Sequence, residues 1–575
     1  MHALRFSLAL CVVGFVAITE TVAQSLVRIQ GPGGRQTSGN DVVVGFSPDE
    51  RFVYVLADDA LAADSNGFMD VVRQDRWSGV NVVVSRTSTG AASNGDVSFA
   101  SLSANGRYLY TVTLADNLGP SDTNGLDDVY IHDLASGTVR RASVGLGGAE
   151  SDAGSYYGEV SNDGRYVAFA SEASNLVAAD NNGAYDVFLR DFTLGSTTRI
   201  NLKPGGGESP NGADLPQLSA DGRYVVFLSS ADDLVAGDTN NVTDIFVRDR
   251  QTSTMARVNL GFGGIEANGD TYYWMRMSPN ARWVVFSSFA TNLAPGANGN
   301  IEVYLADRQT GSVTLESVGS GATPSDGASL DPWVSDDGRF VAFFSDATTL
   351  DPNDSDTDTD MFWRDTALGV TRMASFSTGG FPGQLPPFFG PSWGGPCMSA
   401  SGRLVGFGSN YQGLVAGDTN LADSFLWDSQ STLPAIESYC TAKVNSLGCT
   451  PAISSGGEPH TAGAVDAFFV SAHNVLNNKS GLFLWSFSPA LLPFGGGTLC
   501  VGPPVVRTTA MVSGGTPTGS DCSGSYSYRF TQAYLAAKGI TPGTSVYVQA
   551  WSRDSGFAAP NNIGLSDGLH FTAAP

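Results

Sequence analysis

The chain has 575 residues, of which 15% are charged and 69 are glycine. This length exceeds one ordinary domain, and many glycines with few charges favour turn-rich β structure over helical bundles. A net charge of −25, from 31 basic and 56 acidic residues, opposes binding to nucleic-acid phosphates or anionic membranes. We therefore expect no nucleic-acid partner. Cationic ligands such as Ca²⁺ suit the acids better, although surface acids also serve ordinary solubility.

The first 23 residues have the layout of a signal peptide. Arg5 precedes an apolar run over residues 6–18, and Thr21-Val22-Ala23 provides a small-residue cleavage site. The apolar run is shorter than the roughly 20 residues that a spanning helix needs, and no later segment is long enough. The sequence thus predicts an exported protein without a membrane span, either secreted or in the cell envelope, at the periplasm or cell surface.

Downstream, one unit recurs seven times with a spacing of 56 to 64 residues. The copies begin with SPDERFVYV at 47, SANGRYLYT at 103, SNDGRYVAF at 161, SADGRYVVF at 219, SPNARWVVF at 278, SDDGRFVAF at 335 and SASGRLVGF at 399. Asp-Gly or Asn-Gly turns between short β-branched and aromatic runs are typical of four-stranded propeller blades. In each unit we expect strand A to end at the serine, followed by strands B, C and D, for example at 166–171, 186–191 and 197–202.

The strand count predicts how the ring closes. The seventh unit has no D strand, whereas residues 25–30, SLVRIQ, resemble a D strand before the first A strand. One closed ring would use both and remove open sheet edges. We therefore expect an all-β chain: a seven-bladed β-propeller closed by an N-terminal strand over residues 24–432, and a small C-terminal β-sandwich over 433–575.

The repeated text carries a family resemblance. Ser-x-Asp-Gly-Arg-Tyr-Val-x-Phe followed by Asp-Val-Phe-x-Arg-Asp resembles TolB-like β-propeller repeats, which are relatives of WD repeats, over about residues 26–430. The resemblance implies the fold. It implies no single activity, because that superfamily hosts scaffolds, binding modules, peptidase-associated propellers and some polysaccharide lyases. The units here are longer than the usual TolB-type repeat, mainly through an acidic loop between strands B and C.

The acidic loops place oxygen-bearing side chains at positions 1, 3 and 7, as Ca²⁺ coordination requires. The five full loops contribute Asp64, Asn66, Asp70, Asp122, Asn124, Asp128, Asp180, Asn182, Asp186, Asp238, Asn240, Asp244, Asp354, Asp356 and Asp360. They lack the bidentate glutamate of an EF-hand, so a modest affinity is expected. The alternative is an Asx turn that directs the chain into strand C. Shortened loops at Ala297 and Asp418 show that a unit does not need all three oxygens.

Two other repeated positions predict architecture. An arginine starts every strand B and an aspartate ends every strand C, so each blade can form one ion pair, tied in by the serine that ends strand A. The arginines are Arg51, Arg107, Arg165, Arg223, Arg282, Arg339 and Arg403, and the aspartates are Asp75, Asp133, Asp191, Asp249, Asp307, Asp365 and Asp428. Seven equal copies argue against catalysis, which needs one unequal site.

Aromatic residues just before strand A differ from blade to blade. The candidates are Tyr156, Tyr157, Tyr272, Tyr273, Trp274, Trp333 and Trp393. They share a propeller face with the acidic loops, which suits recognition of a sugar, a peptide or a cationic ligand. The alternative is packing between blades.

No catalytic motif stands out, since the five histidines support no triad or zinc motif. We therefore expect a monomeric, non-enzymatic binding protein with a protein or carbohydrate partner. A polysaccharide hydrolase or lyase using unidentified carboxylates at the propeller mouth is one alternative, and a structural envelope protein is another.

The C-terminal region contains four of the five cysteines that remain after signal removal. In an oxidising compartment they predict two disulfides, for which we favour the local pairs Cys440 with Cys449 and Cys500 with Cys522. Cys397 is then a buried small apolar residue. Short strands are expected at AFFVSA, GLFLWSFS, YSYRFT and SVYVQAWSR, and residues 558–568 as a loop. The region resembles C-terminal modules of exported bacterial proteins, which names no activity.

Overall fold

A computed structural model describes most of the chain after the predicted signal peptide, which lies outside the described residues. The described residues are 25–29, 41–58, 61, 66–76, 79–119, 122–376, 396–409, 414, 423–429, 437–439, 442–456, 459, 468–515, 520–541, 544–559 and 561–573. Strands dominate this part of the chain, in which α1 (Gln532–Ala537) is the one α-helix. None of the described helices has both the length and the hydropathy that crossing a bilayer requires.

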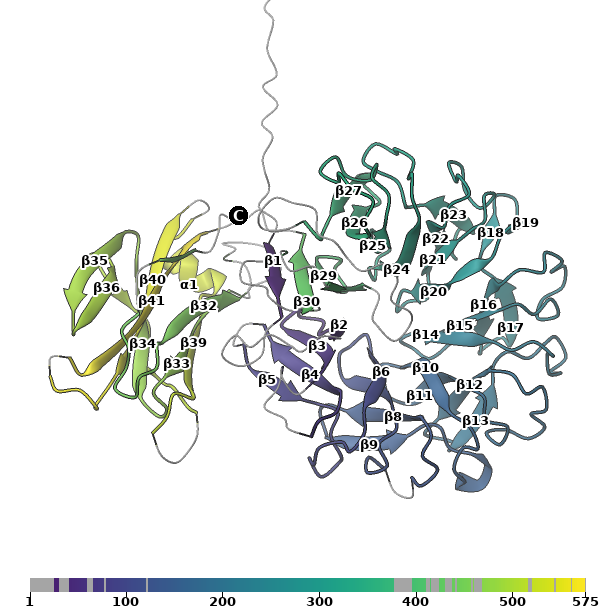
Figure 1. Ribbon diagram of the computed structural model, residues 1–575, viewed down its shortest axis with the longest axis horizontal. Coiled ribbons are helices and arrows are strands. Elements are labelled where there is room, and N and C mark those ends of the chain that lie inside the picture. The colour runs from purple at the N-terminus through teal and green to yellow at the C-terminus, as the bar shows by residue number, and fades with distance from the viewer. Residues whose placement is uncertain are drawn as a thin grey trace, which may run out of the picture.

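Seven four-stranded antiparallel sheets surround a common axis (Figure 1). The first four are β2 (Val42–Phe46), β3 (Phe52–Ala57), β4 (Asp70–Asp75), β5 (Asn81–Val83); β6 (Val97–Leu102), β7 (Tyr108–Thr113), β8 (Asp128–Asp133), β9 (Thr138–Arg141); β10 (Ser155–Val160), β11 (Tyr166–Ser171), β12 (Asp186–Asp191), β13 (Ser196–Arg199); and β14 (Asp214–Leu218), β15 (Tyr224–Ser229), β16 (Asp244–Asp249), β17 (Thr254–Arg257). The next two are β20 (Thr271–Met277), β21 (Trp283–Ser288), β22 (Glu302–Asp307), β23 (Ser312–Leu315); and β24 (Ser329–Val334), β25 (Phe340–Ser345), β26 (Asp360–Asp365), β27 (Val370–Met373). A short hairpin of β18 (Leu260–Gly261) and β19 (Ile265–Glu266) follows the fourth blade.

The N-terminal strand closes the ring, as the strand count predicts. Blade seven has the order β1-β30-β29-β28, with β1 (Ser25–Arg28), β28 (Cys397–Met398), β29 (Leu404–Ser409) and β30 (Asp423–Asp428). β1 pairs antiparallel with β30 in the register Leu26 with Trp427. The first and last segments of the propeller therefore share one sheet, in which β1 covers the edge that β30 would otherwise expose.

Buried strands and tight turns build each blade. Strands B and C carry apolar side chains on both faces, as in blade four, where the Phe227 and Phe246 rings stack with centroids 5.9 Å apart. Gly222 in the turn from A to B has a φ of +71° and packs against the Tyr166 ring of the preceding blade, so a Cβ there would lie 2.4 Å from that ring. The Asp-Gly turn thus serves both chain reversal and packing between blades.

The predicted arginine–aspartate pair forms in all seven blades. The nitrogen–oxygen distances are 2.6 to 2.8 Å for Arg51–Asp75, Arg107–Asp133, Arg165–Asp191, Arg223–Asp249, Arg282–Asp307, Arg339–Asp365 and Arg403–Asp428. The serine that ends strand A has a different role from the one predicted. In blade four Ser219 donates to Asp221 and accepts from Tyr224 N, so it orders the turn and does not contact the ion pair.

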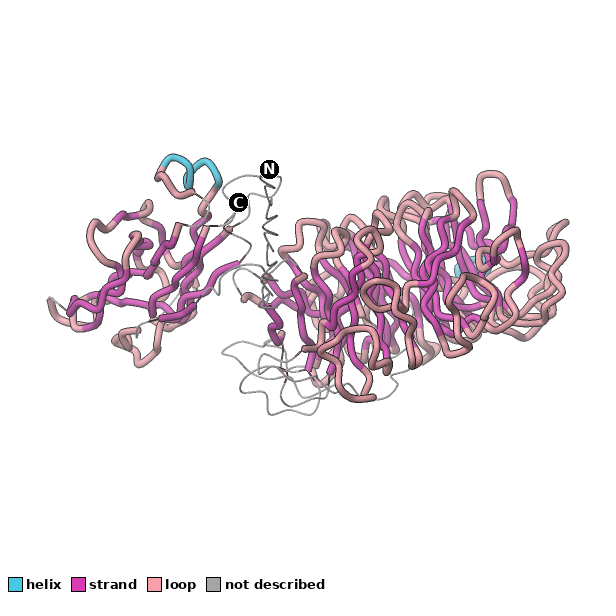
Figure 2. The backbone as a smooth tube through the Cα atoms, turned by 90° about the horizontal axis from the view of Figure 1, so that it is seen from above, coloured by secondary structure: helices cyan, strands magenta, loops and turns pink. Residues whose placement is uncertain are grey.

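The C-terminal region forms the predicted sandwich beside the ring (Figure 2). One sheet has the order β31 (Glu437–Tyr439), β41 (Ile563–Thr572), β40 (Ser545–Arg553), β34 (Ser480–Ser486), β37 (Val506–Arg507), with β38 (Met511–Val512) also on β34; the other is β32 (Ala452–Gly456), β33 (Phe469–Val475), β39 (Gly524–Arg529). A hairpin of β35 (Pro489–Phe494) and β36 (Gly497–Val501) is added. Val470, Trp485 and Phe571 from both sheets share one core.

Two predictions for this region are wrong. Cys449 is bonded to Cys522, 73 residues away, so neither local pair forms; Cys500 is also disulfide-bonded, and Cys440 lies outside the described residues. The reason is sheet order: β32 and β39 flank β33 in parallel, so the residues just before each of them meet at one end. Residues 558–568 are not all loop either, because β41 begins at Ile563 and pairs with β40.

Candidate functional site

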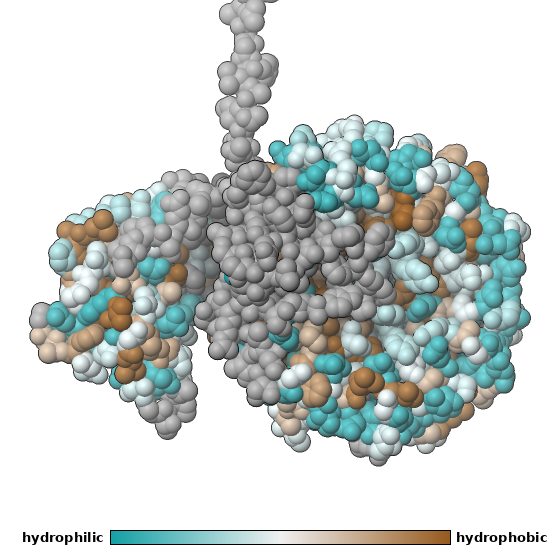
Figure 3. All heavy atoms as spheres, viewed as in Figure 1, coloured by the Kyte–Doolittle hydropathy of each residue, from teal (hydrophilic) through white to brown (hydrophobic). Residues whose placement is uncertain are grey.

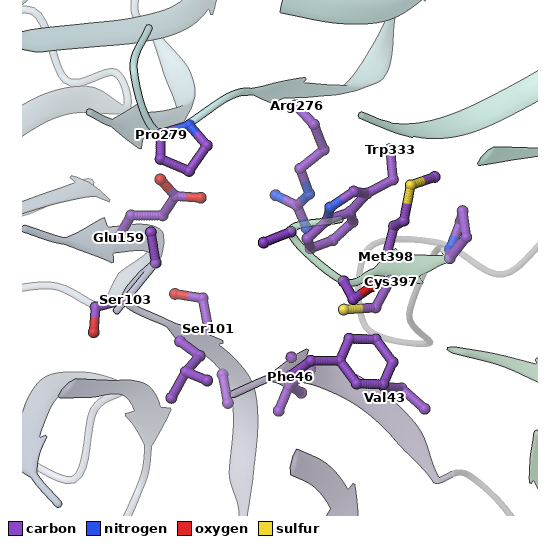
Figure 4. Close-up of a pocket in the computed structure, with 18 of the residues that line it drawn as sticks. Val43, Phe46, Ser101, Ser103, Glu159, Arg276, Pro279, Trp333, Cys397 and Met398 are labelled. Atoms are coloured by element: carbon purple, nitrogen blue, oxygen red, sulfur yellow. The ribbon is translucent and has the colours of Figure 1, made fainter. Parts of the chain in front are cut away.

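The seven inner strands enclose a cavity of about 170 Å³ on the propeller axis (Figure 4). Each blade contributes strand A: β2, β6, β10, β14, β20, β24 and β28. Hydrophilic residues mostly occupy the rim of the ring, and hydrophobic ones gather further inward (Figure 3). The cavity is smaller than the roughly 300–1,000 Å³ of a drug-sized pocket, so it suits a small molecule or one end of a larger one.

One structurally equivalent position gives the cavity its asymmetry. The residue two places before the strand-A serine differs in every blade: Gly45, Ser101, Glu159, Gln217, Arg276, Trp333 and Cys397. All of these except Gln217 line the cavity. We call this set the axial ring. The axial ring provides the single unequal site that the repeated arginines and aspartates do not.

Most polar members of the axial ring are used in holding neighbouring blades together. Ser101 Oγ donates to Gly158 O at 2.9 Å, and Leu218 N donates to a carboxyl oxygen of Glu159 at 3.0 Å. Gln217 donates to Met275 O at 2.9 Å and accepts from Met277 N at 2.6 Å. These contacts join the inner strands of blades two to five, which explains why the Gln217 side chain lies in the wall.

Arg276 is the exception within the axial ring. Among the described residues, its guanidinium makes no hydrogen bond and no ion pair within 4.0 Å. It lies over the Trp333 ring, 4.3 Å from the ring centroid, and 5.5 Å from that of Trp274. Figure 4 shows Arg276, Trp333, Glu159 and Cys397 converging on the same space from different blades. The five N–H donors of this arginine are therefore available to a ligand.

Two carboxyl groups share the cavity with Arg276. Burial raises the pKa of Glu159 to about 7, and the opposing effect of Arg276 is smaller. Burial likewise raises the pKa of Asp331 to about 7. Asp331 lies in a bulge of β24 with a φ of +49°, a conformation that few non-glycine residues adopt. Below pH 7 both groups are neutral beside a charged arginine; above pH 7 both are anionic.

The free thiol of Cys397 completes this group. Cys397 is buried and unpaired, as predicted. Burial raises its pKa to about 12, so the group is a neutral thiol and adds no charge to the cavity.

The aromatic candidates divide into two sets. Trp274 and Trp333 line the cavity, and Tyr157 packs edge-on between Trp274 and Phe99, with centroids 6.1 and 5.3 Å away. The remaining tyrosines do not line the cavity: Tyr156 packs on Tyr185, and Tyr272 contacts Tyr273 and Phe289. Trp393 lies outside the described residues. Packing and cavity lining thus coexist.

In blades two to four an arginine occupies the centre of the acidic loop. In blade four, Arg257 Nη1 lies 2.7 Å from Asp238, 3.0 Å from Asp244 and 2.9 Å from Glu266. Arg199 contacts Asp180, Asp186 and Glu208 at 2.7 to 3.2 Å in blade three, and Arg141 contacts Asp122, Asp128 and Glu150 at 3.3 to 3.6 Å in blade two. The last residue of strand D thus supplies the cation in these three loops.

The asparagine at position 3 makes an Asx turn in these blades. Asn182 Oδ1 accepts from Ala184 N at 3.2 Å, while its Nδ2 donates to Asp186 and to Ser209 O. Asn240 in blade four repeats these contacts with Asp244 and Ala267 O. Asn124 in blade two donates to Ser151 O, and Asn66 in blade one donates to Asp70. The amide oxygen is engaged by the turn in each case, and Asp64 lies outside the described residues.

Blade six has neither the arginine nor the asparagine. Met373 takes the place of Arg257, and Asp356 takes that of Asn240. Asp354, Asp356 and Asp360 place carboxylate oxygens within 4.8 Å of one another, so this group can hold a metal. Burial raises the pKa of Asp360 to about 8 and that of Asp354 to about 6. The group Asp180, Asp186 and Glu208 is equally close, but Arg199 lies within it.

A hydroxyl or amide after strand D, which the sequence reasoning missed, holds the position-7 acid in blades one to six. In each blade it donates to that acid and accepts from the next backbone N–H of strand C. The pairs are Ser85–Asp70, Ser143–Asp128, Asn201–Asp186, Asn259–Asp244, Ser317–Glu302 and Ser375–Asp360. The sequence pattern that could have predicted this contact is the Ser or Asn that follows the position-7 acid by fifteen residues in every unit.

Comparison with known proteins finds only distant structural likenesses. No family model and no curated protein matches the chain. An oligogalacturonate lyase in complex with manganese aligns with a TM-score of 0.44 and 12% identity, over 72% of this chain and 98% of that one. A putative TolB from Agrobacterium tumefaciens aligns at 0.31 and 18%, over 49% and 81%, and Porphyromonas gingivalis dipeptidyl peptidase 4 at 0.39 and 13%, over 76% and 58%. Likeness at this level says nothing about activity.

Proposed function

We propose that this protein is an exported, non-enzymatic binding protein that holds a small carboxylate-bearing ligand in its axial cavity. The observation that carries the proposal is the Arg276 guanidinium, which faces the cavity with no hydrogen-bond or ion-pair partner among the described residues. Burial lowers the pKa of Arg276, and the attraction of Glu159 only partly offsets this effect, so the positive charge of the arginine is incompletely compensated in the cavity. A ligand anion would supply that partner.

The ligand class follows from the groups around Arg276. A planar guanidinium recognises a carboxylate through two parallel N–H···O bonds. The indoles of Trp274 and Trp333 add flat apolar walls, which suit the face of a sugar ring or a short apolar chain. Glu159 and Asp331, neutral below pH 7, can exchange hydrogen bonds with hydroxyl groups. A hydroxylated acid, such as a uronic-acid residue at the end of a glycan, satisfies all three.

The charge of the cavity predicts a pH dependence for this binding. Glu159 and Asp331 bind protons as pH falls through 7, so Arg276 becomes the one charged member of the three. Anion binding should therefore be strong at pH 6 and weaker at pH 8, by on the order of tenfold or more. A cationic ligand would show the opposite order.

The test compares matched acidic and neutral ligands. Glucuronate with glucose and galacturonate with galactose, as free sugars and as glycan ends, are titrated by calorimetry at pH 6 and pH 8. We expect the acids to bind and the neutral sugars not to bind. Arg276→Gln should abolish binding, whereas Arg248→Gln, a half-buried strand-C arginine outside the cavity, should retain it. Equal binding of acids by both variants, or no binding of any acid, would contradict the proposal.

The enzyme alternative has one observation in its favour. Glu159 and Asp331 face one cavity with pKa values of about 7, which a general acid–base pair needs near neutral pH. Incubation with anionic polysaccharides, followed by assays for new reducing ends and for unsaturated products, separates the two functions. Product that disappears in Glu159→Gln and Asp331→Asn would favour a hydrolase or lyase over simple binding. A structural envelope protein would bind and cleave none of these probes.

We also propose a signal peptide, domain bounds, a compartment and an oligomeric state for the chain. Residues 1–23 would be a signal peptide, 24–432 the propeller and 433–575 the sandwich. The Cys449–Cys522 disulfide supports an oxidising compartment such as the periplasm or cell surface. We expect a monomer with a carbohydrate or protein partner.

A further inference from the structure

The acidic loops of the blades differ in how their buried negative charge is compensated. In blades two to four, an arginine is surrounded by two aspartates whose side chains are at most 6% exposed and by a glutamate whose side chain is 25 to 28% exposed. In blade five Ala297 replaces the first aspartate and Leu315 replaces the arginine. Glu302 is then the acid that remains in this loop. Each of these arrangements limits the negative charge that is buried without a counter-charge.

Blade six departs from this rule in two independent places. Met373 removes the cation on strand D, and Asp356 replaces an amide that elsewhere donates hydrogen bonds with a third carboxylate. Both changes make the group more negative. No Arg, Lys or His of the described part of the chain lies within 4.0 Å of Asp354, Asp356 or Asp360.

Two buried oxygens in this group have no hydrogen-bond partner. Asp360 Oδ1 accepts from Ser375 Oγ at 2.5 Å, but Oδ2 accepts nothing, and the residue is fully buried. Asp354 Oδ2 is likewise without a hydrogen-bond partner, and this residue is 8% exposed. Asp356 Oδ1 accepts from Asp358 N at 3.0 Å as part of the loop turn. Buried carboxylate oxygens without donors are the ligands that a hard cation takes.

The donor set identifies the cation. All three side chains offer oxygen, and the described residues bring no histidine or cysteine into the group. Oxygen-only sites favour Ca²⁺, Mg²⁺ or Mn²⁺ over zinc or copper. Buried aspartates on a loop, with water for the remaining positions, suit the irregular six to eight oxygens of Ca²⁺ better than the strict octahedron of Mg²⁺.

We propose that, among the acidic loops that the structure describes in full, that of blade six binds one Ca²⁺, through Asp354, Asp356 and Asp360. The loops of blades two to four bind none, because their arginines already occupy the position of the ion. The site is independent of the axial cavity, and its ion orders the entry into β26.

The test measures Ca²⁺ stoichiometry on the metal-stripped, purified full chain by calorimetry and by elemental analysis after dialysis. We expect one Ca²⁺ per chain in the wild type. Met373→Arg, which copies blade four, should bind none. Asp356→Asn, which restores the amide of the other loops, should weaken binding at least tenfold. Asp238→Asn in blade four is the matched control and should retain one Ca²⁺.

Several outcomes would overturn the proposal. Failure of the wild type to bind Ca²⁺ at millimolar concentration is one. Loss of the ion from Asp238→Asn together with its retention in Asp356→Asn is another, and tighter binding of Mg²⁺ or Mn²⁺ than of Ca²⁺ would assign a different cation. Circular dichroism checks that each variant is folded. If Met373→Arg does not fold, the conservative Asp356→Asn still decides the outcome.

Discussion

Blades four and six pair their strands in the same way and have acidic loops of equal length, yet the two loops differ in charge. In blade four the guanidinium of Arg257 lies among Asp238, Asp244 and Glu266. In blade six the equivalent residue is Met373, and three aspartates remain without a protein cation among the described residues. The ligand preference of such a loop therefore depends on the last residue of strand D, because that residue supplies the counter-charge in blade four and does not in blade six.

The largest expected effect comes from removing the cation of blade four. Arg257→Met leaves Asp238 and Asp244 buried without a partner, which costs about 3–5 kcal/mol of unfolding free energy. The variant loop then resembles blade six, so Ca²⁺ should restore part of the loss. Guanidinium denaturation with EDTA and with excess Ca²⁺ measures both. If the variant is as stable as the wild type in EDTA, Arg257 does not compensate the charge of Asp238 and Asp244, and the explanation of the difference between blades four and six is wrong.

The sequence alone predicted most of the fold because its signals are local. Turn residues, alternating apolar runs and a fixed spacing all lie within one unit, and the alignment of units placed β1 in blade seven. The disulfides were missed because the pairing depends on β32 and β39 flanking β33, which is a matter of sheet order.

The sequence predicted only part of the candidate site, for a related reason. The oxygens at positions 1, 3 and 7 are adjacent in sequence, but their cation comes from Arg257, thirteen residues after Asp244 and on another strand. The axial ring was not predicted, although the aligned units show it as a column of seven different residues. Repetition draws attention to equal columns such as Arg223, which are architectural, whereas the unequal column containing Arg276 lines the cavity.

Blade five has an acidic loop with one acid and no arginine, and a change of its acid is expected to have an intermediate effect on stability. Its single acid, Glu302, is buried, and burial raises its pKa to about 7. The folded state therefore holds a proton that the unfolded chain releases near pH 4.5, so this residue costs stability as pH rises from about 5 to 8. Glu302→Gln should raise the free energy of unfolding at pH 8 by about 1–3 kcal/mol and leave it nearly unchanged at pH 5.

Thermal and chemical denaturation of Glu302→Gln at both pH values provides the measurement. Gln copies the shape of the protonated acid and can still hydrogen-bond to Ser317. Glu316→Gln, an acid of the same blade that is paired with Arg364, is the matched control and should not become more stable at pH 8. Equal stabilisation of Glu302→Gln at pH 5 and pH 8 would contradict a buried, neutral glutamic acid.

The smallest effect is expected at the ion pair that all blades share. Arg282 holds the pKa of Asp307 down to about 2, mainly through their hydrogen bond, so the pair stabilises the fold above the unfolded pKa of about 4 and loses that contribution as pH falls through 2. The Arg282 side chain is 40% exposed, so solvent screening makes the loss of unfolding free energy in Arg282→Gln at pH 7 smaller than the changes expected for Arg257→Met and Glu302→Gln. The equivalent Arg223→Gln and Arg339→Gln in blades four and six should cost the same and leave Ca²⁺ binding unchanged. Urea denaturation measures the loss of unfolding free energy in each variant. A larger loss for Arg339→Gln than for Arg223→Gln would mean that the ion pair and the acidic loop of blade six are coupled. The two blades would then differ in more than the residue at the end of strand D.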